Sequence, residues 1–296
     1  MAVGIAPTAQ AVSYTFTTLD YTPTGINDAG DIVGNGPGGG LFYSGGGFTN
    51  ISAFRPYGIN NHGDVVGTNS SFQGALLSGG TITTLQIPYD EFFGTPLTMF
   101  EDINDSGQIV GNAGASGGFR SFIYSGSDYT FLASPFGGPF YNSETFATGI
   151  NNHGDIVGTE SYRSGSEERG VLVSGGITTS IRFPDAYITR VEGVNDAGQV
   201  VGLTGGYNIV DGLPGSWWTH GFVWSEGIFS TVDVPGAIST HILDLNNSGQ
   251  LVGTYQDASG MHGFIATPVQ VPEPSGLLLL SSGIVGLIAL RNRCLV

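Results

Sequence analysis

The sequence predicts an all-β fold, a six-bladed β-propeller closed by the N-terminal strand and followed by a C-terminal apolar helix. Three observations support this: a ten-residue phrase occurs six times, short strand-like segments follow each copy, and no helical periodicity appears before residue 275. The phrase occupies Gly25–Gly34, Gly58–Gly67, Asp102–Gly111, Gly149–Gly158, Gly193–Gly202 and Asp244–Gly253.

Each phrase predicts a tight β-hairpin. It contains an apolar residue, an Asn-Asx-x-Gly turn and an apolar pair. The asparagine side chain can accept a bond from the backbone two residues on, and the glycine can adopt the positive φ that a type I turn with a bulge needs. Successive first asparagines lie 33, 44, 47, 44 and 51 residues apart, a spacing typical of propeller blades.

Two further strands are expected after each hairpin. A third, apolar segment bounded by glycine recurs at residues 40–46, 74–80, 120–126, 169–176, 220–225 and 262–266. A fourth follows at 82–85, 177–181 and 229–234. The sixth unit lacks this fourth strand because Pro268 follows at once, whereas residues 14–20 have its pattern. Pairing of that N-terminal segment with the last unit would close the ring and protect its sheet edges.

Composition excludes several classes of protein. The chain has 50 glycines in 296 residues, eight arginines, no lysine and a formal charge of −16. Such a charge repels phosphate, so we expect no nucleic-acid partner. Cys294 is the single cysteine, so neither an intrachain disulfide nor a cysteine-based metal site is expected.

The C-terminal end has three successive features. Pro272, Glu273 and Pro274 form a Pro-Glu-Pro motif, residues 277–290 are apolar, and Arg291 and Arg293 follow. This arrangement resembles the PEP-CTERM sorting signal of Gram-negative bacteria, although Asn292 interrupts its basic cluster. The resemblance implies export, transient membrane anchoring by the helix and processing by an exosortase at the inner membrane. Those five residues would then carry sorting and processing, and the protein would reach the cell surface or extracellular matrix.

Four segments follow from these features. Residues 1–11 end in an Ala-Gln-Ala site, and we interpret them as the remnant of a signal peptide. Residues 12–268 would form the six-repeat propeller, 269–275 a linker with the Pro-Glu-Pro motif, and 276–296 the apolar sorting helix with its basic tail.

The repeats also resemble the HAF family of probable extracellular repeats. The hairpin phrase matches in all six units, and a His-Gly-Phe strand matches at His220–Phe222 and His262–Phe264. The resemblance implies an extracytoplasmic repeat protein and brings no established catalytic residues.

The histidines and turn carboxylates favour structural roles. His62 and His153 share a turn position with alanine and serine, which indicates an exposed tip, and His220 and His262 precede a strand, where a structural hydrogen bond is expected. Asp28, Asp31 and their counterparts could bind calcium, but the loop is short and glutamine replaces Asp31 at 108, 199 and 250. We expect no cofactor, with calcium as the alternative. Asp102 and Asp244, which replace glycine at the phrase start, could cap strands.

Aromatic insertions are the best candidate binding segments. Residues 204–219 carry Tyr207, Trp217 and Trp218 among glycines, and residues 134–145 and 90–100 carry phenylalanine and tyrosine. We interpret them as loops presented by a rigid scaffold, where aromatic rings can stack on sugars or simply cover the blades. Residues 161–169 form a further, polar insertion.

The expected function is non-catalytic. No nucleophile elbow is recognisable, so the sequence favours an exported component of the exopolysaccharide matrix or cell surface that binds polysaccharide or a matrix protein. One alternative is a glycan hydrolase or lyase with paired carboxylates at the ring axis, where a raised pKa would favour an enzyme. The other is a structural protein whose repeats self-associate.

Overall fold

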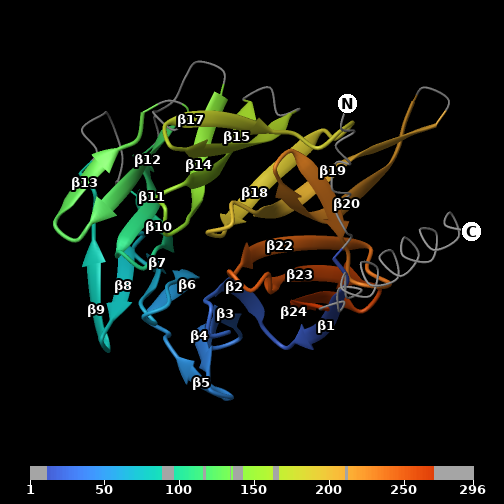
Figure 1. Ribbon diagram of the computed structural model, residues 1–296. Helices are drawn as coiled ribbons and strands as arrows, with labels where there is room; N and C mark the ends of the chain where they lie inside the picture. The colour runs from blue at the N-terminus through green and yellow to red at the C-terminus, as the bar shows by residue number, and fades with distance from the viewer. Residues whose placement is uncertain are drawn as a thin grey trace, which may run out of the picture. The chain divides into compact units, whose positions relative to one another are not determined.

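The computed structural model describes residues 12–88, 97–115, 118–133, 135, 143–162, 167–210 and 213–269. All regular elements in these ranges are strands, β1 to β24, so the all-β prediction is confirmed for them (Figure 1). The signal-peptide remnant, the Pro-Glu-Pro motif, the sorting helix and its basic tail lie outside the described residues. The chain divides into a large unit, Phe16–Thr267, and a second unit made of its two ends.

Each of the first five repeats forms four antiparallel strands in sequence order, as the hairpin phrase and its two following segments predict. The first three repeats comprise β2 (Thr22–Ile26), β3 (Ile32–Gly36), β4 (Gly39–Ser44), β5 (Gly47–Asn50), β6 (Phe54–Ile59), β7 (Val65–Asn69), β8 (Gly74–Ser78), β9 (Thr81–Leu85), β10 (Leu97–Ile103), β11 (Gln108–Ala115), β12 (Gly118–Ser125) and β13 (Asp128–Phe131).

The next two repeats comprise β14 (Ser143–Ile150), β15 (Ile156–Tyr162), β16 (Glu168–Ser174), β17 (Ile177–Ile181), β18 (Ile188–Val194), β19 (Val200–Val210), β20 (Leu213–Ser225) and β21 (Ile228–Val232). A single parallel pair, Glu168 with Ile188, joins these two sheets. The sixth repeat has β22 (Ser239–Leu245), β23 (Leu251–Asp257) and β24 (Gly260–Pro268), and β1 (Tyr14–Leu19) pairs with β24 as its fourth strand.

The hairpin turns have the predicted geometry. In the first repeat the Gly30 amide donates to the Asn27 carbonyl at 3.0 Å, and the Asn27 amide donates to the Asp31 carbonyl at 3.1 Å. The Asn27 side-chain oxygen accepts from Ala29 and Asp31 amides, and Gly30 has a φ of +79°. The Asn27 amide group also donates to the Asp31 carboxylate at 3.2 Å. Gln108 accepts the equivalent bond through its side-chain oxygen, which explains why Asp and Gln interchange at this position.

The buried turn asparagines connect each repeat to the next. Their side-chain amides donate to the backbone carbonyl of the next repeat's asparagine. Asn27 donates to Asn60, Asn60 to Asn104, Asn104 to Asn151, Asn151 to Asn195, Asn195 to Asn246 and Asn246 to Asn27, all at 3.0–3.2 Å. The last bond joins residues 219 positions apart, so the series returns from the sixth repeat to the first.

A second, more exposed series of hydrogen bonds joins the residues that directly follow the buried asparagines. Aspartate and asparagine alternate at this position: Asp28, Asn61, Asp105, Asn152, Asp196 and Asn247. Each asparagine side-chain amide donates to both neighbouring carboxylates at 2.9–3.0 Å. Each backbone amide donates to the side-chain oxygen of the next member at 2.8 Å. Alternation gives every side-chain donor two charged acceptors.

The core lies between successive sheets. The valine that completes the apolar pair of each phrase is fully buried in all six repeats: Val33, Val66, Val110, Val157, Val201 and Val252. Phe122, Phe222 and Phe264 fill the equivalent position of three third strands and are also fully buried. The first strands β2, β6, β10, β14, β18 and β22 contact one another in order, and β22 contacts β2 (Figure 1).

Candidate functional site

The first strand of every repeat contains a β-bulge just before the phrase. The pairing register shifts between Pro23 and Gly25 in β2, and at the equivalent place in the other five first strands. A bulge leaves one residue unpaired and re-aims its side chain. The six bulged residues are Thr24, Tyr57, Glu101, Thr148, Glu192 and Leu243.

These six residues line one cavity of about 270 Å³ together with Asp102 and Asp244. The bulges therefore gather one side chain from each repeat at a common site. The two aspartates stand where the other repeats have glycine. Asp102 lies over Gly58 of the preceding repeat, where an added Cβ would come 2.5 Å from its carboxylate oxygen, and Asp244 lies over Gly193 in the same way.

Both aspartates are also bonded to the backbone. Asp102 accepts from the Ile103 amide at 2.8 Å and the Ile150 amide at 2.9 Å, and Asp244 accepts from the Leu245 and Ile26 amides, each at 2.8 Å. Each carboxylate thus joins its own repeat to another one. Burial raises the pKa of Asp102 to about 7, although the two backbone hydrogen bonds act to lower it. Burial, and then the Asp102 charge, raise the pKa of Asp244 well above its ordinary range.

Glu101 has the environment of a proton donor. Burial raises its pKa to about 7, and the charges of Glu192 and Asp102 act in the same direction. Its Oε1 accepts from the Asn112 side-chain amide at 3.1 Å. Burial and then the Glu101 charge raise the pKa of Tyr57, which lines the same cavity. A carboxyl that titrates near neutrality can act as a general acid.

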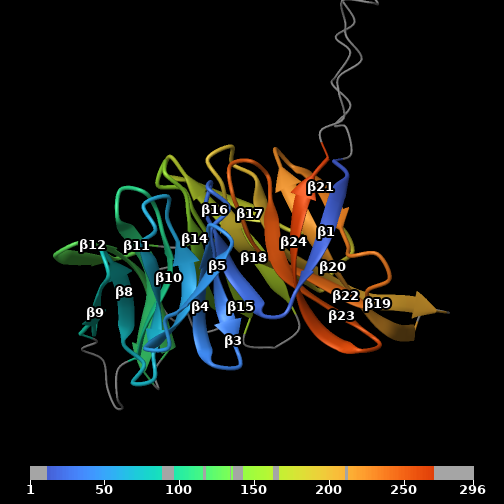
Figure 2. The ribbon, with the colours of Figure 1, turned by 90° about the horizontal axis from the view of Figure 1, so that it is seen from below.

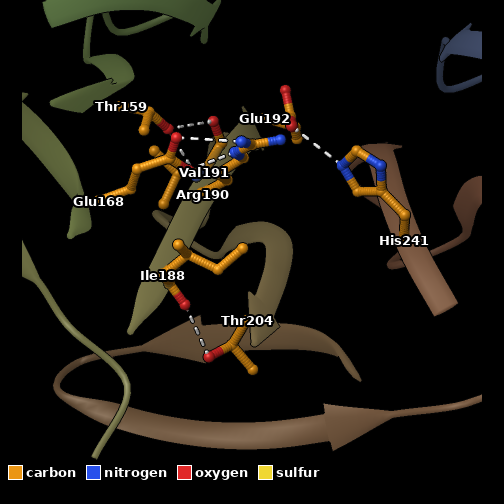
Figure 3. Close-up of polar contacts among 8 residues, drawn as sticks. All are labelled: Thr159, Glu168, Ile188, Arg190, Val191, Glu192, Thr204 and His241. Carbon is orange, nitrogen blue, oxygen red and sulfur yellow. Dashed lines mark hydrogen bonds and ion pairs between the residues drawn. The ribbon is translucent and has the colours of Figure 1, made fainter. Parts of the chain in front are cut away.

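Glu192 is fixed from the neighbouring strand. Its Oε1 lies 2.9 Å from Nε2 of His241 on β22 (Figure 3). Arg190, two residues earlier on β18, binds the Glu168 carboxylate of β16 through two nitrogens. The Val191 amide donates to the Thr159 hydroxyl at 3.0 Å, and the Thr204 hydroxyl donates to the Ile188 carbonyl at 3.1 Å. β18 is therefore held from both sides.

The predicted aromatic candidates lie on strands, and the expectation of a loop at residues 204–219 was wrong. β19 and β20 are 11 and 13 residues long and form a hairpin that extends past the neighbouring sheets (Figures 1 and 2). We call the part of this hairpin beyond Leu203 and Gly221 the ribbon. The β19–β20 pairing continues through the insertion, with one shift of register after Tyr207.

The structure brings two of the three candidates together. Tyr207 and Trp217 are cross-strand partners with ring centroids 4.9 Å apart, and 43% and 45% of their surfaces are exposed. Tyr187 extends this group, with its ring 5.7 Å from that of Tyr207. Trp218 points to the other face of the ribbon, because neighbours on a strand alternate. There it contacts Phe183 and His220.

Glycine lets the indoles lie against the ribbon. A Cβ on Gly205 would come 2.9 Å from the Trp217 ring, and one on Gly206 would come 2.9 Å from the Trp218 ring. The Trp217 ring nitrogen donates to the Thr219 hydroxyl at 3.0 Å, which fixes the orientation of the ring. The result is a pre-oriented aromatic surface, the kind that suits stacking on a sugar.

Two of the four histidines considered from the sequence, His220 and His262, have structural partners. His62 and His153 are exposed at turn tips, as predicted. His220 and His262 lie inside β20 and β24, and not before a strand as expected. Nδ1 of His220 lies 2.7 Å from Asp233. Asp257 and Ser259 both approach Nε2 of His262, at 3.2 and 2.8 Å, whereas a Ser-His-Asp triad needs them on opposite nitrogens.

Other candidates fall partly or wholly outside the described residues: Pro272, Glu273, Pro274, Arg291 and Arg293, and most of insertions 90–100 and 134–145. Residues 161 and 162 end β15, and 168 and 169 begin β16, so the ends of that polar insertion are strands. Within the described ranges, no group of three or more His, Cys, Asp or Glu side chains could hold a metal ion. The same ranges contain no helix long and apolar enough to cross a membrane.

Sequence reasoning missed Tyr57, Glu101 and Glu192 as cavity residues. Each stands directly before the phrase, where the six repeats have unlike residues and no pattern is visible. The available signal was positional: the residue directly before the phrase occupies one equivalent position in every repeat.

Comparison with solved structures gives distant likenesses. "YCF48 bound to D1 peptide" is 13% identical with a TM-score of 0.45, and the match covers 90% of this chain and 100% of that one. A puromycin-hydrolyzing peptidase of Mycobacterium tuberculosis is 13% identical with a TM-score of 0.43, over 81% of this chain and 42% of that one. The polysaccharide lyase Uly1 is 10% identical with a TM-score of 0.40, over 78% and 58%.

No curated protein matches the chain. The family described as the PEP-CTERM protein-sorting motif matches residues 270–293, which confirms the motif recognised in the tail. This motif is recognised by exosortase, and it implies export, membrane anchoring of the C-terminal region and an extracellular destination. The chain therefore carries the signal of an exosortase-sorted extracellular protein.

Proposed function

We propose that the protein is a six-bladed β-propeller, closed by β1, that binds polysaccharide in the extracellular matrix or at the cell surface without catalysing a reaction. The bonds from Asn246 and Asn247 to the first repeat, and the pairing of β1 with β24, support the closed ring. The six similar hairpins support the HAF-type repeat assignment. The sorting motif supports the destination.

The ribbon carries the binding proposal. Tyr207 and Trp217 expose nearly half of their surfaces on a hairpin that extends past its neighbours, and a hydrogen bond holds the Trp217 ring. Rigid aromatic side chains lose little entropy on binding, so they are effective anchors. Gly205 and Gly206 leave room for the indole rings against the strands.

The cavity carboxylates favour a second candidate, a carbohydrate-active enzyme. Glu101 with its raised pKa, beside Tyr57 and Glu192, has the chemistry of a glycan hydrolase or lyase. Asp102 and Asp244 connect repeats, and both oxygens of each accept hydrogen bonds from backbone amides, so these two aspartates are poorly placed for proton transfer. Glu101, whose Oε1 accepts from the Asn112 side chain, carries the enzyme alternative. We prefer binding because the ribbon exposes the Tyr207 and Trp217 rings.

One assay separates the two candidates. The full-length chain, in detergent, is mixed with the producing organism's own exopolysaccharide and sedimented, and released reducing ends and unsaturated sugars are measured in the same tube. We expect the protein to pellet without releasing sugar. Trp217→Ala should weaken pelleting about tenfold, the effect of losing one anchor residue. Phe48→Ala, which removes an exposed ring on β5, is the matched control.

Two results would decide against binding. Sugar release that Glu101→Gln abolishes would establish the enzyme. Pelleting that is unchanged in Trp217→Ala and in Tyr207→Ala would remove the ribbon from the function.

A further inference from the structure

We propose that a groove formed mainly by the second repeat, with residues of the first and third repeats at its sides, binds a carboxylated sugar residue, such as a uronate. This inference adds a second site to the proposed function, and it rests on that function only for the glycan nature of the ligand. The groove has a volume of about 490 Å³, which is enough for one or two sugar rings. Its lining is mainly apolar and includes Phe54, Arg55, Tyr57, Thr68, Phe72 and Met99.

Phe72 occupies a position at which the repeated turn has glycine. Asn69 begins a turn with the same bonds as the phrase turns: its side-chain oxygen accepts from the Ser71 and Gln73 amides, and its carbonyl accepts from the Phe72 amide at 3.0 Å. Phe72 therefore takes the place of Gly30 or Gly63, with a φ of +58°. A bulky residue is strained in this conformation. The sequence pattern hid this turn because phenylalanine replaces its diagnostic glycine.

The strain holds an aromatic ring at the edge of the groove. Phe72 is 57% exposed although it is large and apolar. A glycine would relieve the backbone strain, and a polar residue would remove the exposed surface, so folding favours either over phenylalanine. Strained residues of this kind concentrate at ligand sites, where the ring serves binding. The Phe72 carbonyl also accepts from the Thr98 amide at 2.9 Å, which fixes the turn against β10.

Thr68 provides an independent sign of a missing ligand. It lines the groove, is 7% exposed, and its hydroxyl oxygen has no hydrogen-bond partner among the described residues. Buried hydroxyls are nearly always paired, and an unpaired one calls for an explanation. A hydroxylated ligand in the groove would supply a partner once the Thr68 side chain turns toward it.

Arg55 indicates the charge of the ligand. It stands directly opposite Thr68 across the β6–β7 pair, is exposed, and makes no ion pair with any described residue. The chain has only eight basic residues against 24 acidic ones, so a cation free to bind is unusual here. Guanidinium groups bind carboxylates through two parallel hydrogen bonds. An aromatic face, a hydroxyl and an arginine together suit a pyranose ring that carries a carboxylate.

The test uses two probes that differ only at this carboxylate. Methyl glucuronide and methyl glucoside are titrated into the full-length chain by ligand-observed NMR, in a detergent without sugar headgroups. We expect the glucuronide to bind about tenfold more tightly, as a charge-assisted pair predicts. Arg55→Gln should remove this preference. Arg182→Gln, which alters an exposed arginine paired with Glu167, is the matched control and should keep it.

Phe72→Gly separates binding from folding. Glycine suits the positive φ, so the Tm should stay the same or rise while both probes bind more weakly. Equal affinity for the two probes, unchanged selectivity in Arg55→Gln, or full binding by Phe72→Gly would each overturn the groove site. Such a failure leaves the ribbon to its own sedimentation assay. Variants that lose glucuronide but still pellet polysaccharide would show that the two sites are separate.

Discussion

At the scale of single residues, the same position has different roles in different repeats. Thr24 and Thr148 are small and neutral, whereas Glu101 brings a carboxyl to the same cavity. Burial raises its pKa from an ordinary value of 4.5 to about 7. The folded protein therefore holds this proton more tightly than the unfolded chain does, and the stabilising effect is complete only below the unfolded pKa.

This upward shift of the Glu101 pKa predicts that the free energy of unfolding falls as the pH rises from about 4.5 to about 7. Glu101→Gln keeps an acceptor for Asn112 but has no charge to bury, so it should reduce this slope. At pH 8 it should be roughly 1–3 kcal/mol more stable than the natural protein. Urea unfolding at four pH values between 5 and 8 measures both effects. Asp128→Asn, at an outer edge, is the control, and equal slopes in Glu101→Gln and the natural protein would contradict the burial argument.

At the scale of the element, the phrase needs glycine at two positions of the hairpin, for a different physical reason at each. Gly107 has a φ of +73° and open space around its Cα, so an alanine there would suffer only conformational strain. Gly111 closes the phrase at the position paired with Phe100, where the bulge begins. A Cβ there would lie 2.2 Å from the Met99 carbonyl oxygen and 2.7 Å from the Phe122 ring.

We therefore expect two distinct costs. Gly107→Ala should lower stability by about 1 kcal/mol. Gly111→Ala should cost several-fold more, because the β10 backbone would have to move. Chemical denaturation of the two variants side by side compares them directly. A larger loss in Gly107→Ala would show that the turn, and not the close strand approach, makes the phrase glycine-rich.

Hairpins and strand order could be predicted because their causes are local. The Asn-Asx-x-Gly turn and its positive φ are properties of a few successive residues, and they recur six times. The cavity could not be predicted, since Glu101 and Glu192 are 91 positions apart and meet only through the bulges. The ribbon was misjudged because Gly205 and Gly206 look like loop residues, whereas they make room for Trp217 and Trp218 on paired strands.

At the scale of the whole molecule, the alternation of turn residues fits the closed ring of six repeats that we propose. Each asparagine amide donates to a carboxylate on both sides, whereas a ring with an odd number of repeats would make two like residues neighbours. Partial burial opposes ionisation of Asp196, but hydrogen bonds from Asn152 and Asn247 lower its pKa overall. Its stabilising effect is therefore present at neutral pH and is lost only as the pH falls through this lowered pKa.

The alternation provides a test of ring closure. Asn61 donates to Asp28 and Asp105 within consecutive repeats, whereas Asn247 donates to Asp196 and, across the chain ends, to Asp28. Asn61→Asp exchanges two hydrogen bonds for two repulsions, and should cost about 1–2 kcal/mol at neutral pH and low salt. In a closed ring Asn247→Asp has the same two kinds of neighbour and should lower stability by the same amount.

Both losses of stability should shrink in high salt, because exposed charges are screened. Thermal unfolding of the two variants at two salt concentrations measures this. A loss in Asn247→Asp only half as large would mean that the sixth repeat does not bind the first, and the closed propeller would have to be abandoned.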